Sequence, residues 1–291
     1  MKKTNTETPC PGTLYIVSTP IGNLEDISIR ALRILKETDI IAAESTQHTR
    51  GLCKHYDIST RLVSYHQHNH KTRAPELLNR LKNGKNIALV TNAGTPALSD
   101  PGALLINMAV DEGINVSPVP GASAALAALA VCGLKVDRFL FMGFLSSRQG
   151  KRKKELKELE KETRTIIFYE APHRILSFLE QINEILGNRY IVIARELTKA
   201  FEEIIRGNVK DILKGFDGIK QKGEFTVIVK GNELKNSETE LLPGLEKSIN
   251  DMLKNRGMGV KDIATDISKK YDIPYRTVYK KVLDLKRIYE N

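Results

Sequence analysis

Three turns in this sequence combine residue types that suit the binding of a small charged molecule. Ser18–Asn23 contains Pro20 and Gly22, and Thr91–Gly102 contains two X-Pro pairs and two glycines. Pro118–Ser123 leads into an alanine-rich helical pattern, whose first backbone amides are free to meet an anion or a carboxylate. Glycine allows the backbone to approach a ligand closely. Each turn taken alone is also compatible with a plain connection between a strand and a helix.

The turns follow short apolar runs that alternate with helical patterns. Apolar runs at residues 14–17, 40–43, 62–65, 87–90 and 116–119 predict strands, and residues 27–36 and 74–81 predict helices between them. This alternation predicts a mostly parallel sheet with helices on both faces. A ligand of such a sheet lies beyond the carboxyl ends of the strands, where the three turns would converge.

The remainder of the chain predicts a second α/β segment and a helical appendage. Strands are expected at residues 139–144, 165–169, 190–194, 203–206 and 225–229, with helices at 151–161, 175–186 and 209–213. Three short helical patterns follow at 245–253, 260–270 and 275–289. The predicted organisation is therefore a flexible N-terminus (1–12), two α/β domains (13–134 and 135–231), a polar linker (232–242) and a basic helix-turn-helix-like appendage (243–291).

Composition restricts the classes of function. The 45 Lys and Arg against 35 Asp and Glu give a net charge of +10, which favours a polyanionic partner. No apolar run is long enough to span a membrane and the start of the chain lacks a signal peptide, so we expect a cytoplasmic protein. Three scattered cysteines argue against a disulfide framework or a thiolate metal site. The absence of G-x-G-x-x-G after the first strand and of a P-loop motif disfavours ordinary nucleotide sites.

A longer series of motifs resembles a known family. It comprises residues 15–24, 43–49, 64–69, 92–102, 120–124, 143–145, 169–174, 195–199 and 222–229. In this order the motifs resemble the tetrapyrrole-methylase-like, class III S-adenosylmethionine-dependent methyltransferases, and within them the enzymes that methylate ribose 2′-hydroxyls of bacterial 16S rRNA. The resemblance implies two α/β domains with the cofactor in the cleft between them, a small C-terminal helical bundle, and a homodimer. It implies 2′-O-methylation of a cytidine in the decoding region of 16S rRNA on the small ribosomal subunit.

The resemblance also implies which residues bind S-adenosylmethionine. Carried over position by position, they are Pro20, Ile21, Gly22, Asn92, Ala93, Gly94, Thr95, Pro96, Gly121, Ser123, Ala124, Tyr169, Ala194 and Thr226. The residue types agree with this assignment, because a helix start holds a carboxylate and small residues exclude water without supplying a nucleophile.

Two carboxylates within these motifs are candidates for the base that accepts the 2′-hydroxyl proton. Glu44 ranks first and Asp100 second, although each is equally placed to cap a helix. The resemblance assigns RNA contacts to His48, His66, His68, Arg148, Arg152, His173, Arg174 and Lys199. The basic run at residues 151–154 is either a flexible cationic loop or a solvated helix face. His66, His68 and His70 alternate as zinc ligands would, but no fourth ligand is evident, so no metal is expected.

The chain departs from the family pattern at three positions. Ser45 and Gln47 stand where the family usually has Asp and Arg, and Asn92 stands where it usually has Asp. These changes raise the alternative of a catalytically weakened rRNA-binding assembly protein. A second alternative is a methyltransferase for a small molecule of the porphyrinoid type, because the fold alone does not decide the substrate.

Overall fold

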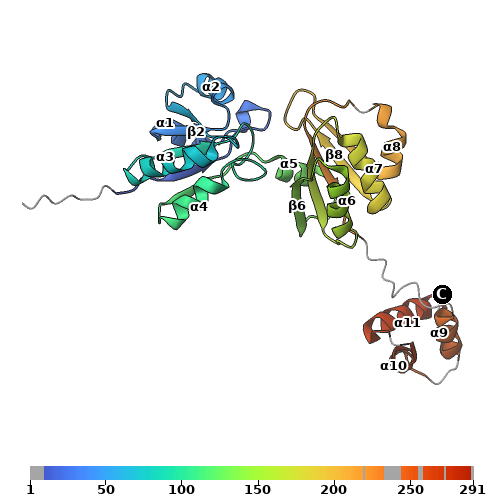
Figure 1. Ribbon diagram of the computed structural model, residues 1–291. Coiled ribbons are helices and arrows are strands. Elements are labelled where there is room, and N and C mark those ends of the chain that lie inside the picture. Colours follow the sequence, from blue (N-terminus) through green and yellow to red (C-terminus); the bar gives the residue numbers. More distant parts are fainter. Residues whose placement is uncertain (1–9, 219, 233–243, 255–257, 272, 290–291) are drawn as a thin grey trace, which may run out of the picture. The chain divides into compact units, whose positions relative to one another are not determined.

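Alternating strands and helices build the N-terminal half of the protein. The computed structural model describes residues 10–218, 220–232, 244–254, 258–271 and 273–289. Its first elements, in chain order (Figure 1), are β1 (Leu14–Val17), η1 (Leu24–Asp26), α1 (Ile29–Glu37), β2 (Ile40–Ala43), α2 (Thr46–His55), β3 (Arg61–Ser64), α3 (His70–Lys82), β4 (Ile87–Val90), α4 (Ala103–Asp111), β5 (Val116–Val119) and α5 (Ala124–Val131).

The five N-terminal strands form a parallel sheet, as predicted, and their order in it is β3-β2-β4-β1-β5. All residues of β2 and β4 are buried, because helices cover both faces. Leu77 of α3 and Leu105 of α4 pack on one face, whereas Leu35 of α1 and Cys53 of α2 pack on the other. Strands β4 and β1 are neighbours at the centre of this sheet. The connection from β1 runs to one side, toward β2, and the connection from β4 runs to the other side, toward β5. Such a switch point opens a crevice at the carboxyl edge of the sheet.

The following elements form a second sheet with mixed strand directions. They are β6 (Phe139–Phe144), α6 (Gln149–Glu158), β7 (Thr165–Glu170), α7 (Ile175–Ile185), β8 (Tyr190–Arg195), β9 (Glu203–Asn208), α8 (Val209–Lys214), η2 (Phe216–Gly218) and β10 (Phe225–Val229). The strand order is β6-β7-β10-β8-β9, and only the β6–β7 pair is parallel. The sequence predicts these strands but not their directions.

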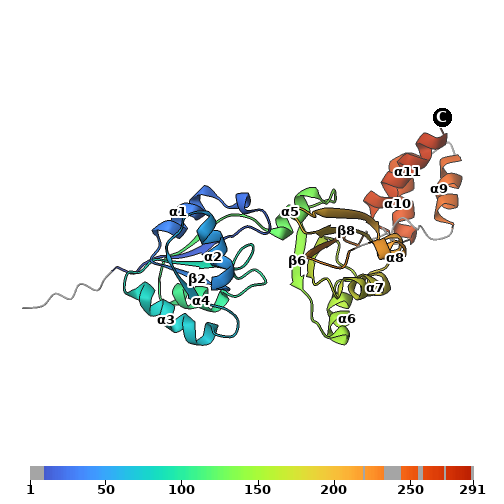
Figure 2. The same ribbon diagram turned by 90° about the horizontal axis from the view of Figure 1, so that it is seen from above.

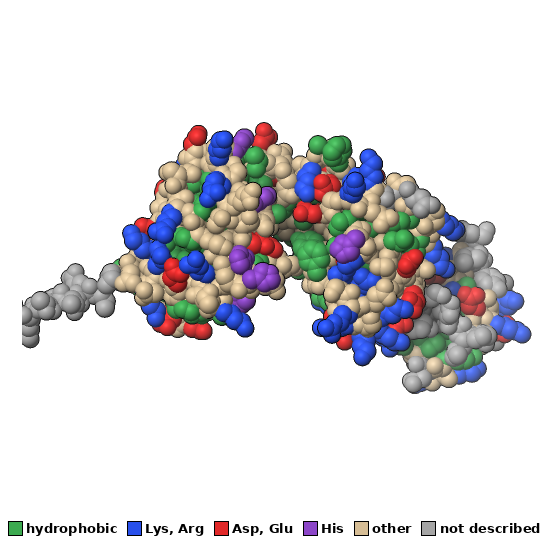
Figure 3. All heavy atoms as spheres, turned by 45° about the horizontal axis from the view of Figure 1, so that its top comes forward, with side chains coloured by type: hydrophobic (Ala, Val, Ile, Leu, Met, Phe, Trp, Pro, Cys, Tyr) green, Lys and Arg blue, Asp and Glu red, His purple; other side chains and the backbone are tan. Residues whose placement is uncertain are grey.

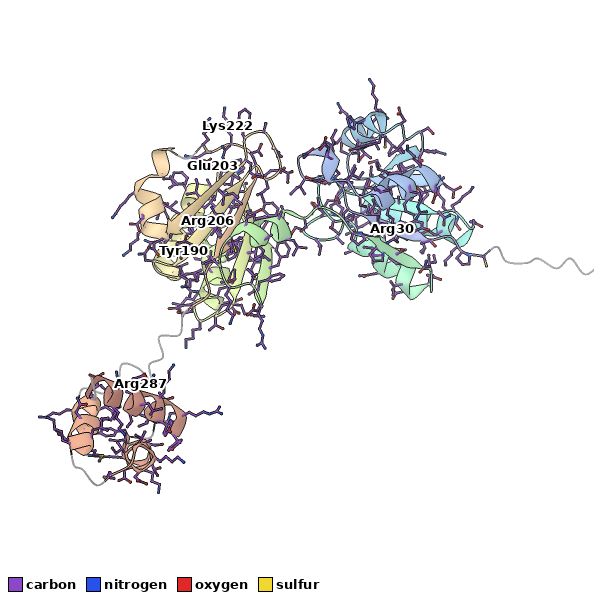
Figure 4. The ribbon with its side chains drawn as sticks, turned by 180° about the vertical axis from the view of Figure 1, so that it is seen from behind. Arg30, Tyr190, Glu203, Arg206, Lys222 and Arg287 are labelled. Atoms are coloured by element: carbon purple, nitrogen blue, oxygen red, sulfur yellow. The ribbon has the colours of Figure 1, made fainter. Side chains whose placement is uncertain are left out.

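Helix α5 connects the two sheets. Ala128 and Leu129 of α5 pack against Ile167 and Ile228 of the second sheet. Arg206 of β9, labelled in Figure 4, donates to the backbone carbonyl of Val131 at the end of α5. Although the predicted boundaries place α5 in the N-terminal domain, its apolar face therefore belongs to the core of the second sheet. Residues 1–231 form one compact unit.

The C-terminal helices form a separate unit over residues 232–291. They are α9 (Leu245–Lys254), α10 (Val260–Tyr271) and α11 (Tyr275–Tyr289), visible together in Figure 2, and they match the three predicted helices. Ile249, Ile263 and Val278 share their buried cluster, and Tyr271 packs against it. The predicted linker falls almost wholly on residues 233–243, and most of the predicted N-terminal tail on residues 1–9, which lie outside the described parts. No helix in the described parts is long and apolar enough to cross a membrane.

Candidate active site

The three chemically suited turns lie side by side at the carboxyl edge of the parallel sheet. The Thr19 amide donates to the Gly94 carbonyl at 2.9 Å, and the Gly94 amide donates to the Thr19 carbonyl at 3.0 Å. The hydroxyl oxygens of Ser18 and Thr95 are 2.8 Å apart. A Cβ on Gly121 would lie 3.0 Å from the Cβ of Ser18, so the third turn approaches the first so closely that a side chain there would require its neighbours to shift.

A cavity of about 690 Å³, called the larger cavity below, lies against these turns. Residues of the first sheet that line it include Ser18, Ile21, Ala93, Gly94, Thr95, Asp100, Gly121, Ser123 and Ala124, and residues of the second include Phe139, Phe141, Phe144, Tyr169, Phe225 and Thr226. Its volume lies within the range of sites for small molecules and cofactors.

The start of α5 supplies the polar end of the larger cavity. Ser123 is the N-cap of α5, and its side chain makes no capping hydrogen bond. The Ala125 amide donates to the Tyr169 hydroxyl at 3.2 Å, and burial raises the pKa of Tyr169. A helix start with exposed amides attracts a carboxylate.

The residues that the sequence assigns to the cofactor divide between two cavities. Those that line the larger cavity are Ile21, Ala93, Gly94, Thr95, Gly121, Ser123, Ala124, Tyr169 and Thr226. Pro20, Gly22 and Asn92 line a smaller cavity of about 560 Å³, which Ile21 and Ala93 share. Pro96 lines neither cavity, and Ala194 is buried within β8 beside Thr226.

The two candidate carboxylates are near each other, and neither caps a helix. The side chain of Glu44 accepts a hydrogen bond from the Asn92 amide at 3.0 Å. Burial and the charge of Glu44 raise the pKa of Asp100 from 3.8 to about 6. The capping alternatives are wrong, because Ser45 caps α2 through its hydroxyl and Gly102 is the N-cap of α4.

Asn92 occupies the position where the family usually has an aspartate. Its side-chain Oδ1 is buried and has no hydrogen-bond partner among the described residues. Its own backbone amide holds the Glu44 carboxylate, so an aspartate here would place a second carboxylate close to Glu44. The neutral amide therefore avoids a like-charge contact at this point.

Among the predicted RNA-contacting residues, His48 and Lys199 line the smaller cavity. The Lys199 ammonium pairs with Glu196 at 2.8 Å and with Glu224 at 3.0 Å. His66 and His68 lie in the turn after β3, where the His68 amide donates to the Nδ1 atom of His66 at 3.2 Å, and His173 is exposed after β7. Among the described residues, no group of three or more His, Cys, Asp or Glu side chains is arranged to hold a metal ion.

The prediction that Arg152 contacts RNA is wrong, because its side chain is buried. Arg152 is 1% exposed, and its guanidinium donates to Gln181 at 2.6 Å and to Ser177 at 3.1 Å. The guanidinium lies 3.7 Å from the Glu170 carboxylate. The basic run at residues 151–154 is not a flexible loop, because it lies within helix α6, which begins at Gln149. Lys151 and Lys154 are exposed on this helix.

Arg174 makes its contacts inside the protein as well. Its guanidinium pairs with Glu170 at 2.9 Å and donates to the carbonyl oxygens of Leu145 and Ser146. Glu170 also accepts a hydrogen bond from the Ala171 amide at 2.8 Å. The cluster of buried Arg152 and Glu170 with partly buried Arg174 thus fixes the turn after β7, which lines the larger cavity. Arg148 is the exposed arginine of the predicted RNA set.

Sequence reasoning missed the aromatic wall of the larger cavity. Phe141 and Phe144 both face Tyr169, with ring centroids 5.1 and 5.5 Å from its own. An odd spacing of three residues places side chains on opposite faces of a regular strand, so only an irregular strand brings both rings to one cavity. The signal available in the sequence is Gly143, a glycine inside a strand pattern, which indicates a bulge.

Comparison with known proteins agrees with this fold and site. The chain belongs to the tetrapyrrole (corrin/porphyrin) methylase family, whose model matches residues 13–213. It is therefore a methyltransferase enzyme, and S-adenosylmethionine is its methyl donor.

The sequence relatives are more specific. The chain is 49% identical over 230 residues to ribosomal RNA small subunit methyltransferase I of Halalkalibacterium halodurans, covering 79% of this chain and 80% of the relative. It is 42% identical over 279 residues to the protein of the same name from Synechocystis, covering 94% and 98%. The fold resembles uroporphyrin-III C-methyltransferase of Thermus thermophilus complexed with S-adenosylhomocysteine, with a TM-score of 0.55, 16% identity, and coverage of 75% of this chain and 97% of that structure.

Proposed function

We propose that this protein methylates the ribose 2′-hydroxyl of a cytidine in the decoding region of 16S rRNA. The observation that carries the proposal is the 42% identity to a ribosomal RNA small subunit methyltransferase I over 94% of this chain and 98% of that relative, because it includes the C-terminal helices as well as the methylase fold. A likeness confined to the fold would support many substrates.

The larger cavity fits the methyl donor, which supplies an electrophilic methyl group on a sulfonium. The first amides of α5, at Ser123 and Ala124, would hold its carboxylate. Phe141 and Thr226 would flank the adenosyl group. The close approach of Gly121 to Ser18 leaves no room for a larger side chain there, and the Ser18 hydroxyl is engaged with that of Thr95 at 2.8 Å.

Asp100 and Glu44 provide the acid–base chemistry in this proposal. Asp100 lines the larger cavity, and its pKa of about 6 makes it mostly ionised at neutral pH and a stronger base than an ordinary carboxylate. Burial is the main cause of that raised pKa, and the charge of Glu44 adds to it. Because methyl transfer is an in-line displacement, alignment of the hydroxyl with the methyl carbon would supply much of the rate, and the base a smaller part.

RNA would bind over a basic surface. Arg148, Lys151 and Lys154 are exposed, and His48 and Lys199 line the smaller cavity. Residues 243–291 carry 11 Lys and Arg against 7 Asp and Glu, a net charge of 11 − 7 = +4. Cations of this kind bind a phosphate backbone without reading its sequence, so the RNA fold would select the target.

Transfer of a labelled methyl group tests the proposal. Purified small subunits and free 16S rRNA, both from cells lacking the modification, are incubated with the protein and labelled S-adenosylmethionine, and the modified sugar is mapped. We expect label at one cytidine 2′-oxygen. Label on a base, on a porphyrinoid precursor supplied in parallel, or on no substrate would contradict the proposal. A reaction without protein controls for non-enzymatic transfer.

A further inference from the structure

A bulge in β6 directs Phe144 into the larger cavity. Along the β6–β7 pair, Phe141 lies opposite Ile167 and Phe144 lies opposite Tyr169, so three steps along β6 match two steps along β7. Because of the extra residue, the side chains of both phenylalanines lie on the same face of the sheet. Without it, Phe144 would point away from Tyr169 and from the cavity that both residues line.

Gly143 makes this bulge possible. Its φ of +60° is a backbone conformation that side chains disfavour, and a Cβ on it would lie 2.5 Å from the Ser99 hydroxyl. The bulge therefore packs directly against the turn that carries Asp100, one of the two candidate bases. Phe144 and Asp100 therefore line the same cavity on neighbouring segments.

The Phe144 ring is only partly covered by the protein. Phe144 is 56% exposed, whereas Phe225 on the same cavity is 3% exposed and Phe141 and Tyr169 are half-buried. A ring left in water on a cavity wall gives up the free energy of burial, which an occupant with a flat apolar face would recover.

The chain beyond Phe144 is cationic. Arg148, Lys151 and Lys154 follow within ten residues and are exposed, and in the described parts the side chains of Arg148 and Lys154 have no ion-pair partner. In Figure 3, hydrophobic side chains and a group of Lys and Arg side chains lie on the same face of the part of the protein that contains the second sheet. An aromatic platform followed by cations is the arrangement that binds an unpaired nucleotide.

We propose that a nucleobase of the RNA strand stacks on Phe144 while neighbouring phosphates contact Arg148 and Lys154. This inference rests on the proposed function and adds the means by which an unstacked nucleotide is held beside Asp100. The occupant is RNA rather than the donor's adenine, because the donor carries no phosphate for the adjacent cations. Half-buried Phe141 and Tyr169 offer the donor a more enclosed wall.

The test separates stacking from apolar contact. Phe144→Leu keeps an apolar side chain and removes the aromatic face, whereas Phe144→Trp keeps an aromatic face. Phe201→Leu is the matched control, because Phe201 is 71% exposed and lines neither cavity. For each full-length protein we would measure the KM for small subunits in methyl transfer, the Kd for S-adenosylmethionine by calorimetry, and the mass in solution.

We expect Phe144→Leu to raise the KM for RNA about tenfold, equivalent to about 1.4 kcal/mol, with an unchanged Kd for the donor. Phe144→Trp and Phe201→Leu should keep the wild-type KM. A wild-type KM in Phe144→Leu overturns the inference alone. Weaker donor binding without a change in the KM for RNA would also overturn it, because the ring would then contact the donor. A change in the mass in solution would overturn it as well, because the ring would then contact a second copy of the protein. If the wild type methylates no RNA, the proposed function fails and this inference with it.

Discussion

Replacing Arg152 with methionine tests the conclusion that this arginine stabilises the protein and does not bind RNA. The substitution removes the hydrogen bonds to Gln181 and Ser177. It also removes the ion pair with Glu170, in which the guanidinium and the carboxylate are 3.7 Å apart. It keeps an unbranched apolar chain beside the Phe178 ring, over which the guanidinium lies at 5.9 Å. The cavity left in the core is therefore small.

The magnitude follows from what remains of the cluster. Breaking a buried ion pair costs about 3–5 kcal/mol when the surviving charge has no partner. Glu170 keeps Arg174 at 2.9 Å and the Ala171 amide at 2.8 Å, so we expect Arg152→Met to cost about 2–3 kcal/mol. Glu170→Gln leaves a buried guanidinium without a carboxylate and should cost the full 3–5 kcal/mol. At about 2–4 °C per kcal/mol for a unit of 231 residues, Arg152→Met lowers the melting temperature by about 4–12 °C.

Thermal unfolding followed by far-ultraviolet circular dichroism measures this loss, and Lys153→Met is the control. Lys153 pairs with Glu184 on the surface, with side chains 44% and 59% exposed, so its loss should cost under about 1 kcal/mol. If Arg152→Met has the melting temperature of the wild type and instead raises the KM for RNA, the structural role of Arg152 is refuted. The assignment of Arg152 to an RNA phosphate would then stand.

Three further predictions concern the cavity. Gly121→Val should weaken S-adenosylmethionine binding more than tenfold, since its Cβ would crowd Ser18; an unchanged affinity in calorimetry would place the donor elsewhere. Because Asp100 has a raised pKa of about 6 and acts as a base only when ionised, kcat should rise between about pH 5 and 7 and lose that rise in Asp100→Asn; a flat wild-type profile would remove Asp100 from the chemistry. Asn92→Asp should not raise kcat, because the negative charge that it adds would lie close to the Glu44 carboxylate; a large gain at equal RNA affinity would show that the natural protein is a weakened enzyme.

Local patterns were sufficient to predict the strands of the fold and most of its helices, although α2 and α4 were not predicted. The alternation of apolar runs with amphipathic helices predicts each strand of the first sheet, because period and burial are properties of neighbouring residues. The position of β10 between β7 and β8 was not predictable in this way. It depends on pairings such as Val227 with Phe168 and Ile193, which are distant in sequence and leave no local signal.

The parts of the candidate site that are formed by backbone turns were predictable from the sequence. The parts that depend on the direction in which a side chain points were not. Turns rich in glycine and proline disclose the loops that meet at Thr19 and Gly94, because those residue types serve few other purposes. Arg152 and Arg148 look equivalent in the sequence, yet one is buried and one exposed. Helix phase, not residue type, separates them, and a bulge likewise decided the direction of Phe144.

The central place of β10 has a consequence for synthesis on the ribosome. Until residues 225–229 emerge, the β6–β7 and β8–β9 pairs each present an open edge, which is a template for wrong pairing. At least 62 further residues follow Val229 in this chain, since 291 − 229 = 62. At about 5–20 residues per second their translation takes about 3–12 s, long compared with the formation of a strand pair. The C-terminal helices therefore give the last strand time to insert before the chain is released.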